Sequence, residues 1–278
     1  MTSAGAAIAS PSPFPLLPVE PRPILIVKTG NTLDALRGQQ GDFDDWIARG
    51  LGADAGAIEV CDPRKGTLLP EPETLRAVVI TGSHEMVSHR APWSERTAEW
   101  LARCVQAEVP VLGICYGHQL LAHAMGGTVD FHPGGLEIGT VALHLASAAQ
   151  HDPLFAGLPE QFPVQVIHRQ SALQLPPGAV PLAANAHEPH QAFRIGRCAW
   201  GVQFHPEFDA AAMRGYVQAQ APNLDDPDAV AAQVRPTPEA ASLLGRFAQL
   251  AAGGTGRETT SAASLTGYGA SVFQPFQE

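Results

Sequence analysis

The feature that most constrains this chain is the segment VLGICYGHQLLAHAMGG at residues 111–127. Its first part, 111–114, is a short apolar run of the kind found in strands covered on both faces. Residues 118–125 then have helical spacing, and the glycine pair at 126–127 is a typical helix end. The segment therefore predicts a strand, a tight turn that contains Cys115, and a helix.

A cysteine at such a turn has two interpretations. The free N–H groups at a helix start and the positive end of the helix dipole favour a thiolate at Cys115. A free cysteine is also among the most buried residue types, so a small structural thiol fits the same position. This stretch alone leaves both open, although a strand–turn–helix junction is where reactive side chains become exposed.

The rest of the first half alternates strands and helices. Apolar runs predict further buried strands at 24–27, 57–61 and 76–81, and amphipathic patterns predict helices at 42–51 and 92–107. This alternation is typical of an α/β fold, with a mostly parallel central sheet flanked by helices on both faces.

The second half has short strands separated by turns, which predict a small antiparallel extension of the sheet. These strands are expected at 139–145, 164–167, 182–185, 191–195 and 199–203, followed by helices at 209–220 and 238–251. We expect one domain over 23–251. An Ala-, Ser- and Pro-rich stretch predicts a disordered N-terminal arm at 1–22, and a Gly-, Thr- and Ser-rich stretch predicts a flexible C-terminal tail at 252–278.

Composition excludes several classes of function. The chain has 17 basic and 27 acidic side chains, a formal charge of −10 and no run of basic residues, which argues against nucleic acid or an anionic membrane as partner. No apolar stretch approaches the roughly 18 to 20 residues of a membrane span. The four cysteines are widely spaced with no CxxC pair, which favours a reducing cytoplasm over a disulfide framework.

A second informative segment is WGVQFHPEF at 200–208. An apolar strand would deliver His205 at its end, where Pro206 stops further pairing because it has no N–H. Glu207 lies two residues after His205, so an extended backbone would place both side chains on one side. A carboxylate there could orient an imidazole that faces a thiol, as nucleophilic catalysis requires. A surface His-Pro-Glu turn is the alternative.

Together, the motifs G-x-C-x-G-H-Q at 113–119 and F-H-P-E at 204–207 resemble the class I (triad-type) glutamine amidotransferases. The chain looks most like the stand-alone GMP synthase-like branch, which includes γ-glutamyl peptidases. The resemblance implies the flavodoxin-like class I glutaminase fold. It covers most of residues 24–208 and includes TGSHEM at 81–86, GGLEIG at 134–139 and IHRQSAL at 167–173.

The resemblance implies a triad in which Cys115 is the nucleophile, His205 the general acid/base and Glu207 the residue that orients His205. The substrate would be glutamine or a γ-glutamyl compound, cleaved through a thioester to glutamate and ammonia or an amine. No cofactor is implied.

The resemblance also implies residues around the triad. The oxyanion would be bound by the backbone N–H groups of Ser83 and Tyr116. Ser83 stands where many relatives have glycine, and its β-carbon makes a positive φ costlier. The substrate contacts implied are Gly82, Gln119, His168, Arg169 and Gln170.

Two of these contacts have alternatives. Gln119 could be an ordinary helix-surface residue. Arg169 replaces a glycine that relatives often have, which would favour a different γ-glutamyl leaving group or an acidic substrate, but a solvated loop arginine fits equally well.

Other constellations predict no metal site and no nucleotide site. His84 and His89 resemble the zinc motif HExxH, but i and i+5 do not share a helix face. The sequence HEPH at 187–190 is better explained as a turn between two strands. No glycine pair is followed by the Gly-Lys-Ser/Thr of a phosphate-binding loop.

The number of residues after Glu207 indicates whether the chain could use released ammonia by itself. About 70 residues follow Glu207, fewer than a synthase domain of ordinary size needs. Ammonia would therefore pass to a separate synthase chain, or cleavage of the γ-glutamyl bond would itself be the function. A binding or regulatory protein with a vestigial triad is a third interpretation, and the intact Cys115, His205 and Glu207 weigh against it.

Overall fold

The structure is a computed structural model that describes residues 22–52 and 55–253. The expected N-terminal arm, apart from Arg22, lies outside these residues, as does the expected tail from residue 254 onward. Ala252 and Gly253 belong to the last helix.

Within the described residues, the larger sheet has nine strands in the order β2-β1-β3-β4-β11-β10-β9-β6-β7. The strands from β2 to β11 pair in parallel and the others are antiparallel, which confirms the predicted mixed sheet. The parallel strands are β1 (Ile24–Val27), β2 (Ile58–Cys61), β3 (Ala77–Ile80), β4 (Val111–Ile114) and β11 (Ala199–Val202). The antiparallel strands are β6 (Glu137–Leu145), β7 (Gln161–His168), β9 (Val180–Ala184) and β10 (Ala192–Ile195).

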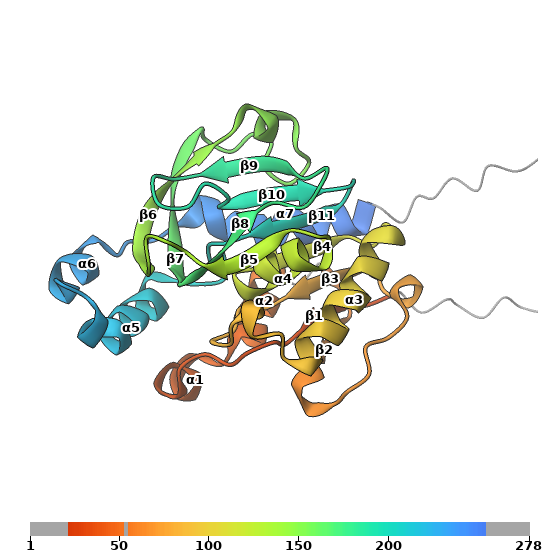
Figure 1. Cartoon of the computed structure of the whole chain (residues 1–278), viewed down its shortest axis with the longest axis horizontal. Coiled ribbons are helices and arrows are strands. Elements are labelled where there is room, and N and C mark those ends of the chain that lie inside the picture. Colours follow the sequence, from red (N-terminus) through yellow and green to blue (C-terminus); the bar gives the residue numbers. More distant parts are fainter. Residues whose placement is uncertain (1–21, 53–54, 254–278) are drawn as a thin grey trace, which may run out of the picture.

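The predicted helices are present as α2 (Phe43–Leu51), α3 (Pro92–Gln106), α4 (Tyr116–Ala124), α5 (Ala210–Gln220) and α7 (Pro238–Gly253). Figure 1 shows α5, with α6, beside the end of the sheet formed by β6 and β7. No helix in the described part of the chain is both long enough and apolar enough to cross a bilayer.

Four elements were not predicted: α1 (Asp34–Gln40), α6 (Pro227–Gln233), and a two-stranded sheet of β5 (Thr128–Phe131) and β8 (Gln170–Gln174). Each is short. Helix α1 buries only Leu36, and α6 buries no residue. Such segments have no apolar stripe, which is the signal that reveals a helix in a sequence.

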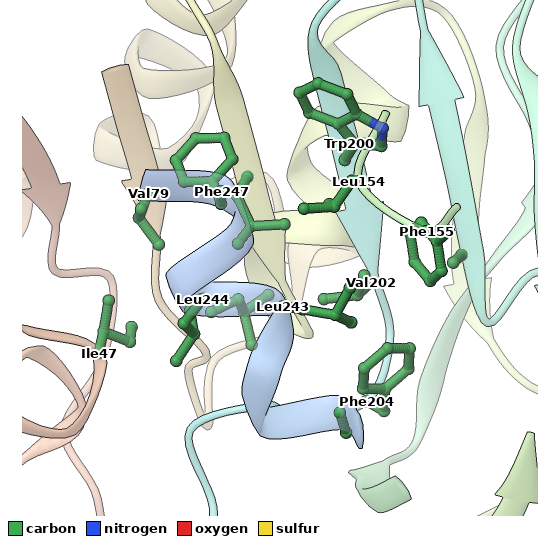
Figure 2. Packing of buried hydrophobic residues seen from close by; sticks show 14 of the residues in the cluster. Ile47, Val79, Leu154, Phe155, Trp200, Val202, Phe204, Leu243, Leu244 and Phe247 are labelled. Carbon is green, nitrogen blue, oxygen red and sulfur yellow. The ribbon is translucent and has the colours of Figure 1, made fainter. Parts of the chain in front are cut away.

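The two faces of the parallel strands pack against different helices. Ile24 and Ile26 belong to one hydrophobic cluster with residues of α2 and α7, whereas Leu25 and Val27 belong to a second cluster with residues of α3 and α4. Successive side chains of a strand point to opposite faces, so an unbroken apolar run can fill both cores. Figure 2 shows α7 in the first cluster, with Phe247 near Trp200.

Helix α4 lies against the strands that precede it, and two glycines allow this contact. A β-carbon on Gly113 would lie 2.3 Å from the carbonyl oxygen of Gly117, and one on Gly117 would lie 2.6 Å from that of Ile80. Both obstacles are backbone atoms, which cannot turn away. The turn with Cys115 is therefore held by a close approach of backbone to backbone.

We expect Gly113→Ala to lower the free energy of unfolding by about 1–3 kcal/mol, because overpacking forces backbone shifts. Thermal denaturation measures this loss as a fall in Tm of about 2–4 °C per kcal/mol. The matched control is Gly38→Ala in α1, where an added β-carbon meets nothing within 4 Å. That variant should be neutral or more stable, since alanine is the better helix former. Equal Tm values for the two variants would contradict the close-packing argument.

Candidate active site

Cys115 lies at the turn between β4 and α4, where its φ is 50° and its ψ −98°. A positive φ is uncommon for a residue other than glycine and is found where structure holds a functional side chain in place. The N–H of Cys115 donates to the carbonyl oxygen of Val202 at 2.8 Å, which fixes the turn to β11. The prediction that this cysteine lies on a strand–turn–helix junction is confirmed.

His205 follows β11, the strand next to β4. Its N–H donates to the carbonyl oxygen of Gln165 at 2.8 Å, and its Nδ1 lies 2.8 Å from Oε1 of Glu207. The Glu207 side chain is fully buried. The ring of Phe208 stacks on the imidazole with centroids 4.1 Å apart. The structure thus brings His205 and Glu207 together as predicted, and they do not form a surface turn.

His205 and Cys115 face the same point, beside Gly82. A β-carbon on Gly82 would lie 3.0 Å from Cε1 of His205 and 3.8 Å from Cβ of Cys115. The other ring nitrogen of His205, Nε2, is buried and has no hydrogen-bond partner in the described structure. The thiol of Cys115 and the imidazole of His205 therefore lie close together, and the carboxylate of Glu207 contacts the opposite side of the imidazole.

The electrostatics of His205 favour its charged form. Burial lowers the pKa of this imidazole, but the charges of Glu207 and Cys115 act in the opposite direction and raise the pKa to about 10. His205 is therefore protonated at neutral pH, so it has a proton to give to a leaving group.

The loop after β3 carries Ser83. Ser83 is not among the described non-glycine residues with positive φ, so its β-carbon adds no strain there. Its hydroxyl donates to the carbonyl oxygen of Thr29 at 2.9 Å and accepts from the N–H of Glu85 at 3.1 Å. A β-carbon on Gly30 would lie 2.5 Å from Cα of Ser83, so the two loops touch. The loop that holds Ser83 is firmly placed beside the site.

Tyr116 is the first residue of α4. The N–H of Gln119 donates to the carbonyl oxygen of Cys115, and the N–H groups before it, including that of Tyr116, have no partner within the helix ladder. The phenol hydroxyl of Tyr116 lies 2.6 Å from Oγ of Ser94, and its ring stacks on Trp93. The side chain thus holds the helix start while the backbone N–H is available to an anion.

Gln119 is buried, with 4% of its surface exposed, so the helix-surface interpretation is wrong. Its Nε2 donates to the carbonyl oxygen of Gln170 at 2.7 Å and to Oε1 of Gln203 at 3.0 Å. The Gln119 side chain therefore ties α4, one turn after Cys115, to β8.

His168 is buried between two acceptors. Its Nδ1 lies 3.0 Å from the carbonyl oxygen of Gln170, and its Nε2 lies 2.8 Å from Oε2 of Glu137. Each ring nitrogen of His168 therefore lies within hydrogen-bond distance of an acceptor oxygen, which fixes the orientation of the ring. Burial acts to raise the pKa of Glu137, but hydrogen bonds from His168 and Asn185 and the charge of His168 lower it below its usual range.

Glu137 was not singled out from the sequence as a site residue. It belongs to the segment GGLEIG, which the resemblance includes, and that was the available signal.

A pocket of about 350 Å³ opens at Cys115. Arg169 is on its wall, where its Nη2 donates to Oε1 of Gln220 at 3.1 Å. Ser83, Tyr116, Gln119, His168 and Gln170 also line the pocket, whereas Gly82, the other expected contact, is not among its lining residues. Lining residues that the sequence analysis missed are Leu33, His84, Glu85, Met86, Leu136, Ile167, Tyr216 and Gln220.

Leu33, Tyr216 and Gln220 lie outside every motif, and the other five lie within the segments 81–86, 134–139 and 167–173 without having been singled out as site residues. His84 is an example, because the sequence analysis considered it only as a metal ligand. Its Nε2 lies 3.2 Å from the hydroxyl of Tyr216. Burial and the charge of His205 lower the pKa of His84, which favours its neutral form beside the charged His205.

The two histidine motifs that were considered as metal sites, at 84–89 and 187–190, form a loop with a 3-10 turn and a turn between strands. His84 lies outside a helix, and His89 ends a 3-10 turn at Val87–His89. Residues 187–190 are part of the turn between β9 and β10, where Oδ1 of Asn185 accepts the N–H groups of His187 and Glu188. Among residues 22–52 and 55–253, no group of three or more His, Cys, Asp or Glu side chains could hold a metal ion.

Comparison with known proteins agrees with this geometry. The family "Glutamine amidotransferase class-I" matches residues 59–219. GMP synthase (glutamine-hydrolysing) of Thermosipho africanus is 38% identical over 37% of this chain and 19% of its own length. The same enzyme of Porphyromonas gingivalis is 34% identical over 53% of this chain and 28% of its own length. The chain thus matches well under two thirds of these relatives.

Solved structures share the fold. A glutamine amidotransferase of Thermotoga maritima has a TM-score of 0.63 at 23% identity, and the match covers 83% of this chain and 97% of that one. A glutamine amidotransferase of Methylobacillus flagellatus has a TM-score of 0.63 at 24% identity, over 83% of this chain and 93% of that one.

We expect iodoacetamide to alkylate Cys115 before the other cysteines at pH 7. Burial is the main cause that raises the pKa of Cys61 and Cys198, and it raises that of Cys104 to about 12, so these thiols stay protonated. Peptide mass spectrometry after limited labelling gives the order. His205→Asn should slow labelling of Cys115, because the variant lacks the imidazole beside Sγ that can act as a base. Faster labelling of Cys198 would contradict this assignment.

Glu207→Gln should lower the pKa of His205 from about 10, because burial then opposes the charged imidazole without the carboxylate to offset it. NMR titration of the imidazole nitrogens measures the change. In the control Glu85→Gln, an exposed carboxylate of the same pocket is neutralised, and the pKa of His205 should stay within a few tenths. Equal titration of His205 in both variants would rule out Glu207 as its partner.

Proposed function

Because this chain belongs to the class-I glutamine amidotransferase family, we propose that it cleaves the γ-amide of glutamine or of a γ-glutamyl compound, with Cys115 as the nucleophile. The observation that carries the proposal is the placement of Cys115, at a positive φ and facing the same point as the His205–Glu207 pair, on the wall of a pocket. That is the arrangement of nucleophile, base and orienting group that acyl transfer requires.

In the first half of the reaction, Sγ of Cys115 attacks the γ-carbonyl carbon and forms a carbon–sulfur bond, and the carbonyl oxygen takes up negative charge. The carbon–nitrogen bond then breaks, and His205 gives its proton to the departing ammonia or amine. A thioester remains. In the second half, His205 removes a proton from a water that attacks the thioester, and the carbon–sulfur bond breaks to release glutamate and the thiolate.

The residues around the triad have supporting roles in this proposal. The backbone N–H groups of Ser83 and Tyr116 bind the oxyanion, where loss of one donor typically costs about 3–4 kcal/mol of barrier. Gly82 leaves room for His205, since a β-carbon there would lie 3.0 Å from the ring. Gln119, His168, Arg169 and Gln170, which are among the residues that line the pocket, contact the substrate. These steps need only water as co-substrate, and we assign no cofactor.

A second candidate function is a glutaminase subunit that acts only when docked to a separate synthase chain. It is favoured by the relatives, which are named GMP synthases and of which this chain matches 19–28% of the length.

We also propose a cytoplasmic location, because the four free thiols suit a reducing compartment. We propose that residues 23–251 form one domain.

The experiment is release of glutamate by the purified chain from glutamine and from γ-glutamyl dipeptides. Cys115→Ala should reduce release by at least about a thousandfold, because the thioester route is lost. The matched control is Cys198→Ala, which removes a cysteine outside the pocket and should keep the activity. Release that survives Cys115→Ala would contradict the mechanism. A wild-type chain that releases nothing would contradict the stand-alone function and favour docking.

A further inference from the structure

Arg169 lies on the pocket wall, two residues after Ile167, whose backbone contacts the nucleophile. The carbonyl oxygen of Ile167, two residues earlier, lies 3.6 Å from Sγ of Cys115. Two residues of extended backbone span roughly 7 Å at most, a length similar to that of a glutamyl side chain with its α-carbon groups. The backbone of Arg169 is fixed, because its carbonyl oxygen accepts the N–H of His132 at 2.8 Å.

The guanidinium of Arg169 has unused donors. Its Nη2 donates to Oε1 of Gln220, and no carboxylate of the described residues lies within 4.0 Å of it. A guanidinium has five N–H donors, so most remain available to a ligand. Gln220 also accepts from Nδ2 of Asn223 at 3.0 Å, which fixes the amide that holds the arginine. By contrast, Arg194 is paired with the buried Asp152.

The distribution of charge in the pocket also favours Arg169 as the site that binds an anionic group. The chain as a whole carries a net charge of −10 and repels anions at long range, so an anionic substrate needs a local cation. Among the residues that line the pocket, Glu85 is the one carboxylate, and Nε2 of His168 is already within hydrogen-bond distance of Glu137. Arg169 is therefore the cation in the wall that an anionic substrate group would meet.

We propose that Arg169 is a specificity-determining residue that binds a carboxylate of the substrate, so that the pocket selects γ-glutamyl donors that carry one. This inference rests on the proposed function of the same site. A γ-glutamyl peptide has two such groups, the α-carboxylate of the glutamyl part and the carboxylate of the departing amino acid. Guanidinium–carboxylate pairs are favoured because two parallel N–H···O bonds can form.

The test compares kcat/KM for two pairs of substrates in the wild type and in Arg169→Gln. The first pair is glutamine and its α-amide, and the second is γ-glutamylglycine and γ-glutamylglycinamide. We expect the wild type to prefer the acid in at least one pair by about tenfold, and Arg169→Gln to remove that preference. Loss in the first pair identifies the α-carboxylate, and loss in the second identifies the leaving group.

Gln220→Glu is a second variant that leaves the arginine in place. Its new carboxylate would pair with the guanidinium and compete with the substrate, so the preference for the acid should fall here too. The matched control is Arg214→Gln on α5, an arginine outside the pocket lining whose Nη2 donates to the carbonyl oxygen of Val234. It should keep both ratios of the wild type.

The outcomes separate the two proposals. Cys115-dependent release with acid-to-amide ratios that Arg169→Gln does not change would overturn the role of Arg169 and leave the proposed function standing. A uniform loss on all four substrates would also overturn it, since that indicates a structural effect. Release that is not Cys115-dependent would overturn both. Unchanged alkylation of Cys115 by iodoacetamide in Arg169→Gln shows that the site itself is intact.

Discussion

The parallel pairing of β4 with β11 is the interaction on which the rest of the site depends. In its register Gly113 pairs with Gly201 and Ile114 with Val202, so both strands end at the same edge of the sheet. The N–H of Cys115 continues the ladder onto the carbonyl oxygen of Val202. A slip of one residue would reverse the faces of every side chain in the strand, and both cores resist it. The thiol and the imidazole, about ninety residues apart, meet for this reason.

The charged His205 is the main electrostatic cost of the site, because a buried charge is expensive unless it is paired. Glu207 is the hydrogen-bonded partner, and its side chain is itself fully buried. The stacked ring of Phe208 covers the imidazole. The same low-dielectric surroundings that make the charge expensive strengthen its attraction to Glu207 and Cys115, which holds the proton on His205.

A second buried pair, His168 with Glu137, holds one wall of the pocket in place. It joins β7 to β6, and through the carbonyl oxygen of Gln170 it is linked to Gln119 on the nucleophile helix. The sequence predicted most of β6 and β7, at 139–145 and 164–167, as short strands separated by turns. It did not predict β8, whose first residues form this wall, because QSALQ combines polar and apolar residues without a clear period.

By itself, the sequence determined the strand–turn–helix around Cys115, the strand that ends in His205-Pro-Glu207, and the mixed sheet, because local periodicity and proline and glycine chemistry specify these. Only the tertiary structure decided the pocket wall. Its contacts join residues far apart in the chain, 51 positions for Arg169 with Gln220 and 132 for His84 with Tyr216. Such contacts depend on how helices and loops pack, and no local pattern of side chains records that.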